Sequence, residues 1–208
     1  MRTTPKLTKD GGYLVNGKLY PRLSDVLASD SIGLRKWKEK VGYEEAERIA
    51  EETSEWGTRV HLVTALNDTK QYKKMEKIIY EDESLLSPLL AWQQYVQEYI
   101  TKWIAIEMIV WSDKLVVAGR VDRVGIIRGD TSPSILDLKT GSLYDEIGIR
   151  LAGYSIMWNE RSKRKTKRYL AIQLPRLNLG EIHTKEYTHP KYEKKFIEAC
   201  EVYHKMYG

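Results

Sequence analysis

The sharpest chemical signal in the sequence is the tripeptide Asp137-Leu138-Lys139, which closes the apolar run 134–138. On a β-strand, residues i and i+2 point to the same face. The carboxylate and the ammonium group are therefore expected to project together, while Leu138 turns the other way into the core. If Arg128 and Ser134 flank the turn before this strand, Asp122 falls beside Lys139, diagonal to Asp137 and within side-chain reach.

Two carboxylates that converge beside a lysine form an arrangement that a hard divalent cation would hold together. Without a cation they repel each other, and one of them should take up a proton. The alternative is a surface ion pair on a hairpin, which contributes little to stability. The position of these charges argues against it, because they end the most apolar runs of the chain and lie next to Gly119 and Gly141.

Glu107 and His61 are two further candidates, and neither is decisive alone. Glu107 interrupts the apolar run 104–110, and a charge there is rarely buried unless it is paired. Two interpretations stay open: Glu107 faces the same site, or it points to solvent from an edge strand. His61 follows Gly57 on an expected helix, where a lone histidine is more often a surface or core residue than a ligand.

The elements that must position these residues follow from apolar periodicity and turn signals. An Asn16-Gly17 turn predicts a hairpin over 12–20, with a short helix through Leu27. Gly57, inside an expected helix, indicates a helix junction or a close backbone approach. Three strands in antiparallel order start at residue 104, and the order of elements predicts an α+β or mixed α/β layered fold. The expected helices are 43–67, 84–103, 145–160 and 190–207, and the further strands are 168–174 and 181–187.

Composition narrows the class of protein. A chain of 208 residues with 42% apolar and 30% charged residues can build one domain, and its net charge of +5 suits a polyanionic partner. Cys200 is the single cysteine, which excludes an internal disulfide framework and a Cys-ligated iron–sulfur cluster. The sequence has no apolar run of about 18 residues and no signal-peptide pattern. We therefore expect a cytoplasmic protein without a membrane span, in the host cytoplasm if the source is viral.

Taken together, these residues resemble the PD-(D/E)XK nuclease superfamily, in particular its RecB-type exonuclease branch and the small nucleases of phages and prophages. That branch carries G-x-x-x-H, a strand glutamate, G-x-x-D, (D/E)-x-K-(T/S) and Q-x-x-x-Y, in that order. One position departs from the pattern, because the family glutamine is Arg150 here, and an arginine cannot accept a hydrogen bond. The matching residues are Gly57 and His61, then Glu107, then Gly119 and Asp122, then Asp137, Lys139 and Thr140, and finally Tyr154.

The resemblance implies a restriction-endonuclease-like core, in which helices flank a central mixed sheet preceded by an N-terminal hairpin and helices. The domain would span 1–208, with the hairpin and helices in 1–103 and the catalytic strands in 104–208. It also implies an Mg²⁺ or Mn²⁺ site. A histidine ligand favours Mn²⁺ slightly. Lys139 would orient the attacking water, and Glu107 would hold a water of a second metal. The implied metal ligands are His61, Asp122, Asp137 and the carbonyl of Leu138, and the catalytic set is Lys139, Asp122, Asp137 and Glu107.

The implied activity is metal-dependent DNA hydrolysis, by an exonuclease of phage recombination, repair or end processing. The alternatives are a single-strand- or structure-specific endonuclease and a non-catalytic DNA-binding module. No Walker A motif is present, so a helicase, like a recombinase or annealing protein, would be a separate partner. The densest basic run, 161–168, is either a phosphate-binding loop or a solvated connection. Candidate DNA contacts are Arg59, Arg120, Arg123, Arg150, Tyr154, Lys163, Arg164 and Lys165.

Overall fold

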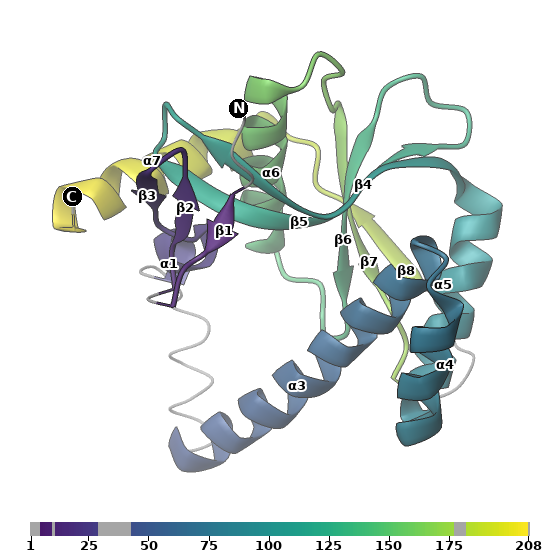
Figure 1. Cartoon of the computed structure of the whole chain (residues 1–208). Helices are drawn as coiled ribbons and strands as arrows, with labels where there is room; N and C mark the ends of the chain where they lie inside the picture. The colour runs from purple at the N-terminus through teal and green to yellow at the C-terminus, as the bar shows by residue number, and fades with distance from the viewer. Residues whose placement is uncertain (1–4, 10, 29–42, 177–181, 208) are drawn as a thin grey trace.

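A five-stranded mixed sheet runs through the middle of the molecule in the order β4-β5-β6-β7-β8 (Figure 1). The computed structural model describes residues 5–9, 11–28, 43–176 and 182–207. β4, β5 and β6 are antiparallel neighbours, as predicted, whereas β7 runs parallel to β6 and β8 antiparallel to β7. A parallel pair requires a crossover, and helix α6 (Ile147–Arg161) supplies it. The strands are β4 (Ile100–Ser112), β5 (Val117–Ile127), β6 (Ser134–Lys139), β7 (Arg168–Gln173) and β8 (His183–Glu186).

Helices cover both faces of this sheet (Figure 1). One face packs against α3 (Tyr43–Asp68), α4 (Tyr72–Glu81), the 3₁₀ turn η1 (Glu83–Leu85) and α5 (Leu86–Tyr99). The other packs against α1 (Leu23–Ala28), α6 and α7 (Pro190–Tyr207). Strand β6 shows the alternation directly, because Ile135 joins the α6–α7 core while Leu136 and Leu138 join the α3–α5 core. The prediction that Leu138 faces the core is confirmed.

A small antiparallel sheet packs against the start of β5. Its strands are β1 (Lys6–Leu7), β2 (Tyr13–Val15) and β3 (Lys18–Tyr20). The β2–β3 turn is the predicted Asn16-Gly17 hairpin, with φ angles of 51° and 81°, the left-handed values that a type I′ turn requires. Buried side chains of β2 and β3 contact Ala118, whose N–H donates to the Pro21 carbonyl at 3.0 Å. The entry segment is thereby attached next to Gly119.

Three of the observed helices differ from the sequence prediction. The predicted helix 84–103 ends at Tyr99 and β4 begins at Ile100, because Ile100, Thr101 and the following apolar residues prefer an extended backbone. Helix α4 was not anticipated. The apolar stripe predicted on the last helix buries Phe196 and Cys200 but leaves Tyr207 65% exposed.

The mixed α+β class is confirmed, with six α-helices in the described ranges. No helix among the described residues combines the length and the apolar character that a membrane crossing demands.

Helices α6 and α7 approach each other closely at Gly153. A Cβ atom at that position would lie 2.6 Å from Phe196 Cε2 and 2.8 Å from Leu23 Cδ1, and both side chains are buried. We expect Gly153→Ala to lower the free energy of unfolding by about 1–3 kcal/mol, despite the better helix propensity of alanine. Urea denaturation measures the change. Gly141→Ala is the matched control, because its Cβ would meet open space; equal stabilities of the two variants would contradict this packing.

Candidate metal centre

The candidate site lies where β5 and β6 separate. The two strands pair from Gly125↔Ser134 to Arg123↔Leu136, and the ladder stops there. Asp122 is the residue before Arg123 on β5, and its carboxylate accepts a hydrogen bond from the Leu138 N–H at 2.8 Å. The side chain of Asp122 thus takes over the position of the next ladder bond.

The predicted register between these strands is wrong by three residues. Asp122 is level with Asp137 rather than diagonal to it, because the turn is flanked by Gly125 and Ser134. The last residues of β5 pair only with β4, and Arg128 leaves the hairpin to donate to the Glu98 and Gln97 carbonyls at 2.8 and 3.0 Å. The loop between the paired residues Gly125 and Ser134 is therefore longer than the predicted turn.

Three side chains meet where β5 and β6 separate, a place that we call the β5–β6 fork. They are His61 of α3, Glu107 of β4 and Asp122 of β5. His61 Nδ1 lies 3.4 Å from Asp122 Oδ2 and 4.0 Å from Glu107 Oε1. Each of the three residues offers one ligand atom, and these atoms all lie within 4.8 Å of one another. Of the two interpretations left open for Glu107, the structure selects the inward one. Its φ of 49° is a left-handed value that a non-glycine residue adopts at a cost of about 1–3 kcal/mol.

Asp137 and Lys139 lie next to this trio at the end of β6. The Lys139 ammonium forms an ion pair with Asp137 Oδ2, as expected from their common strand face. Asp137 is 2% exposed, and its Oδ2 atom has no well-directed hydrogen bond. A metal ion that bound this buried oxygen would have to share it with the Lys139 ammonium.

The three neighbouring carboxyl groups of Glu107, Asp122 and Asp137 have shifted pKa values. Burial, reinforced by the Asp122 charge, raises the pKa of Glu107. Burial also raises the pKa of Asp137, although Lys139 opposes the shift. For Asp122, burial acts in the same direction but is outweighed by His61, Lys139 and the Leu138 N–H, so its pKa is lowered. A divalent cation would relieve the repulsion among these carboxylates.

The donor set fits a divalent metal ion. One imidazole nitrogen and two carboxylates can hold a cation. Asp137 is not part of this group, and its Oδ2 atom is paired with Lys139. Carboxylate oxygens suit Mg²⁺ and Mn²⁺, and an imidazole suits the softer of these ions. The His61–Glu107–Asp122 group can therefore hold a metal ion.

Two glycines of the motifs let the elements close around the fork. Helix α3 runs unbroken through Gly57, so the predicted junction is wrong and the close approach is what the structure shows. A Cβ at Gly57 would lie 3.1 Å from Thr140 Oγ1, next to Lys139. A Cβ at Gly119 would lie 2.8 Å from Tyr154 Cε1, so the α6 tyrosine packs directly on β5.

The candidate DNA contacts differ in how far their side chains are exposed. Arg120 is well placed: its side chain is 60% exposed and its Nε lies 3.0 Å from Glu107 Oε2. Arg59 pairs with Asp82 at 3.3 Å and remains partly exposed. Arg123 is 0% exposed, so the prediction that it touches DNA is wrong; the alternation of strand β5 turns it into the α3–α5 core.

The remaining candidates lie along α6. Arg150 is half-buried in the first turns of α6. Burial opposes its charge, but Tyr154, Asp137 and Asp122 raise its pKa. Tyr154 is buried. The exposed lysines and arginine of 163–165 follow the far end of α6, about 16 Å further along the helix axis at 1.5 Å per residue. The structure does not bring this basic loop to the fork.

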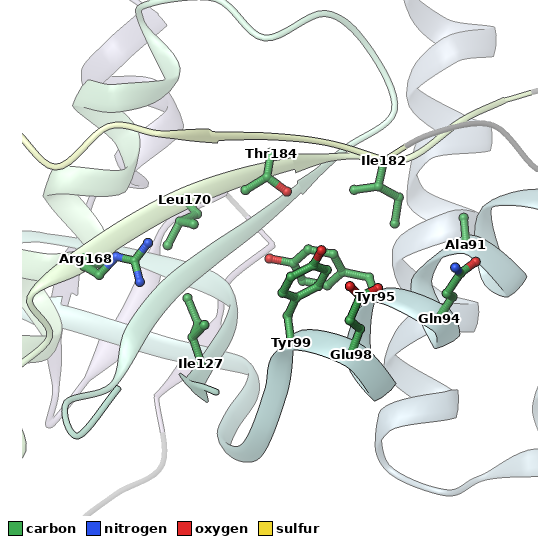
Figure 2. A pocket seen from close by; sticks show the side chains of 10 residues that line it. All are labelled: Ala91, Gln94, Tyr95, Glu98, Tyr99, Ile127, Arg168, Leu170, Ile182 and Thr184. Carbon is green, nitrogen blue, oxygen red and sulfur yellow. The ribbon is translucent and has the colours of Figure 1, made fainter. Parts of the chain in front are cut away.

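A separate hollow lies between α5 and the β7–β8 edge (Figure 2). It has a volume of about 640 Å³ and contains none of the predicted site residues apart from Arg168, the last residue of the basic run 161–168. Two tyrosine rings of α5, Tyr95 and Tyr99, lie together in it with centroids 4.9 Å apart. Arg168 is its basic side chain, and that charge is already paired with Asp130 and Glu186 at 2.8 and 2.9 Å. The convergent titratable groups are at the β5–β6 fork and not in this hollow.

Comparison with known proteins gives a limited result. No family model matches the chain, and no curated protein matches it. A candidate exonuclease from Eubacterium rectale is similar in structure, with 8% sequence identity and a TM-score of 0.46, over 69% of this chain and 64% of its own. The chain thus spans less than two thirds of that protein. SSO0001 is similar over 73% of this chain and 75% of its own, with 14% identity and a TM-score of 0.35.

One part of the site escaped sequence reasoning, namely the buried pair between Arg123 and Asp68. Arg123 Nε lies 2.7 Å from Asp68 Oδ2, and neither side chain is exposed. A signal for it exists: Arg123 alternates with Val121 and Gly125 along an apolar strand, where a charge needs a buried partner. Its partner is 55 residues away in the sequence and could not be named without the fold.

Proposed function

We propose that this protein is a divalent-metal-dependent deoxyribonuclease that acts as an exonuclease in phage or prophage recombination, repair or DNA end processing. One observation carries the proposal: an imidazole and two carboxylates from three separate elements meet within 4.8 Å of one another, beside an aspartate–lysine ion pair. The exonuclease mode and the phage setting are supported by the order of the sequence motifs.

In this proposal, His61, Glu107 and Asp122 hold the cation, with Asp137 and the Leu138 carbonyl completing its protein ligands. When bound, Mg²⁺ or Mn²⁺ supplies Lewis acidity and lowers the pKa of a water molecule. Lys139 orients the attacking water and offsets negative charge that develops on the phosphate. Its ion pair with Asp137 holds the ammonium at the fork, on the same side as the ligands.

DNA would be held by exposed cations around the fork and beyond it. Arg120 is the nearest, since it already contacts Glu107 and is 60% exposed. Arg150, half-buried near the start of α6, would bind a phosphate oxygen. The basic loop with Lys163, Arg164 and Lys165 would contact the backbone of a longer duplex.

We also propose that 1–208 acts as a single domain. Helix α3 belongs to the N-terminal half, yet it supplies His61 to carboxylates of the strands that follow residue 100. A chain divided near residue 103 would leave the site without its imidazole.

Digestion of end-labelled linear duplex and single-stranded DNA, with Mg²⁺ or Mn²⁺ and with excess chelator, tests the proposed function. We expect nucleotide release from the ends that requires the cation. Cleavage of closed circular single strands would instead indicate an endonuclease. DNA binding without cleavage under any metal condition would identify a non-catalytic module, and cleavage undiminished by chelator would exclude the metal mechanism.

His61→Ala is expected to weaken Mn²⁺ binding and to shift the metal preference toward Mg²⁺, because the imidazole is the ligand that suits the softer ion. Titration of each metal into the DNA-free protein gives the ratio of the two affinities. His183→Ala is the control, since His183 lies on the exposed edge strand β8. An unchanged affinity ratio together with a lowered melting temperature would mark His61 as a packing residue.

A further inference from the structure

A buried arginine lies directly behind the candidate metal centre. Arg123 follows Asp122 on β5, and its side chain is completely excluded from solvent. A guanidinium stays ionised in proteins, so its burial requires acidic and polar partners. Asp68 of α3, equally buried, is the principal one, with 2.7 Å between Oδ2 and Arg123 Nε.

The same guanidinium contacts the side chain of Glu107 and, directly or through one hydroxyl group, the backbone carbonyls of Asp122 and His61. Its Nη1 atom donates to Glu107 Oε1 at 3.0 Å and to the backbone carbonyl of Asp122 at 2.8 Å. Its Nη2 atom donates to Thr64 Oγ1 at 3.2 Å. The Thr64 hydroxyl also lies 3.0 Å from the carbonyl oxygen of His61. One planar group therefore links α3, β4 and β5 at the residues that would bind the metal.

Stability alone does not account for this arrangement. Replacing a buried ion pair with apolar residues of similar volume is often neutral or stabilising, so a core at this position has no need of charge. Glu107, in contrast, does need to be held, because its backbone adopts a left-handed conformation. Arg123 contacts the Glu107 oxygen that lies nearest to His61.

We propose that Arg123 is a positioning residue that fixes the three metal ligands in their mutual geometry. The inference rests on the proposed metal-dependent function and extends it to a residue that touches neither metal nor DNA. The planar guanidinium group can donate hydrogen bonds to Asp68, Glu107 and Thr64 at the same time. It thereby sets the spacing between α3 and the two strands.

The test measures Mn²⁺ affinity in the DNA-free protein by electron paramagnetic resonance. Residues that orient metal ligands typically change metal affinity by about 10- to 100-fold when they are replaced. We expect a loss of this size in Arg123→Met and a smaller loss in Arg123→Lys. The lysine keeps a positive charge for Asp68, but a single ammonium group cannot serve all three partners.

A double variant separates positioning from stability. Arg123→Met alone leaves Asp68 as an unpaired buried charge, so its melting temperature should fall. Arg123→Met combined with Asp68→Asn removes both charges and keeps an acceptor for Trp92 Nε1, which donates to Asp68 at 3.0 and 3.1 Å. We expect this double variant to regain most of the melting temperature while Mn²⁺ binding stays weak. Phe196→Leu, in the opposite core, is the control that lowers stability and leaves Mn²⁺ affinity unchanged.

The outcomes distinguish this inference from the proposed function. If the wild-type protein binds no divalent cation, the proposed function fails. If it binds Mn²⁺ and the Arg123 variants bind equally well, only the positioning role is overturned. Recovery of Mn²⁺ affinity together with the melting temperature in the double variant would overturn it as well, because Arg123 would then act through stability alone. If the Arg123→Met variants do not fold, Arg123→Lys decides by the same affinity measurement.

Discussion

Lys139→Ala is expected to slow phosphodiester cleavage by about 10²- to 10⁴-fold, the contribution typical of a positioned proton-transfer group, while the protein still folds and binds metal. The ammonium acts on the attacking water and the phosphate, so its loss should appear in the rate of the chemical step. Metal binding should be retained or strengthened, because the variant removes a positive charge that contacts Asp137 at the edge of the site. Single-turnover cleavage at saturating metal isolates this effect.

The control for this prediction is Lys195→Ala, an exposed lysine on α7. It removes the same charge from the chain without touching the fork, and its cleavage rate should equal that of the wild type. A Lys139→Ala variant with normal turnover and a lowered melting temperature would instead show that the lysine serves the fold, by compensating the buried Asp137 carboxylate.

The parts of the site that the sequence predicted are those set by local rules. Strand alternation was enough to place Asp137 and Lys139 on one face and Leu138 in the opposite core. The Asn16-Gly17 turn followed from the left-handed angles that these residue types tolerate. The element order from β4 to α7 followed from the change in apolar periodicity along the chain.

The parts that the sequence did not predict depend on contacts between distant residues. The β5–β6 register has Gly125 and Ser134 at the turn, while Arg128, expected to flank it, donates to carbonyls at the end of α5. The direction of Glu107 depends on a left-handed φ angle, which no propensity rule assigns to glutamate. The role of Arg123 depends on Asp68 and Thr64 of α3, two residues that carry no motif. Local pattern thus predicted which residues share a strand face, and tertiary packing determined how the strands and helices bring them together.

Asp122→Ala and Asp122→Asn are both expected to abolish metal binding and metal-dependent cleavage, and they should differ in stability. Asp122 is the one carboxylate at the fork whose pKa is lowered, so near neutral pH it is the ligand that most readily carries its charge. The alanine variant also leaves the buried Leu138 N–H without its acceptor at 2.8 Å, which should cost about 1–3 kcal/mol. Asparagine keeps an acceptor oxygen there and should melt close to the wild type.

The pH dependence of metal binding gives this prediction a second check in the wild-type protein. Protons compete with the metal for its ligands, and burial raises the pKa of both Glu107 and Asp137. Apparent Mn²⁺ affinity should therefore begin to fall at a higher pH than unperturbed carboxyl groups would produce, and it should keep falling as the solution is acidified. Calorimetric titration at a series of pH values measures this, with proton release on binding as the accompanying signal. An Asp122→Asn variant that still binds Mn²⁺ with wild-type affinity would remove Asp122 from the ligand set and leave His61 and Glu107 without the charge that draws a cation between them.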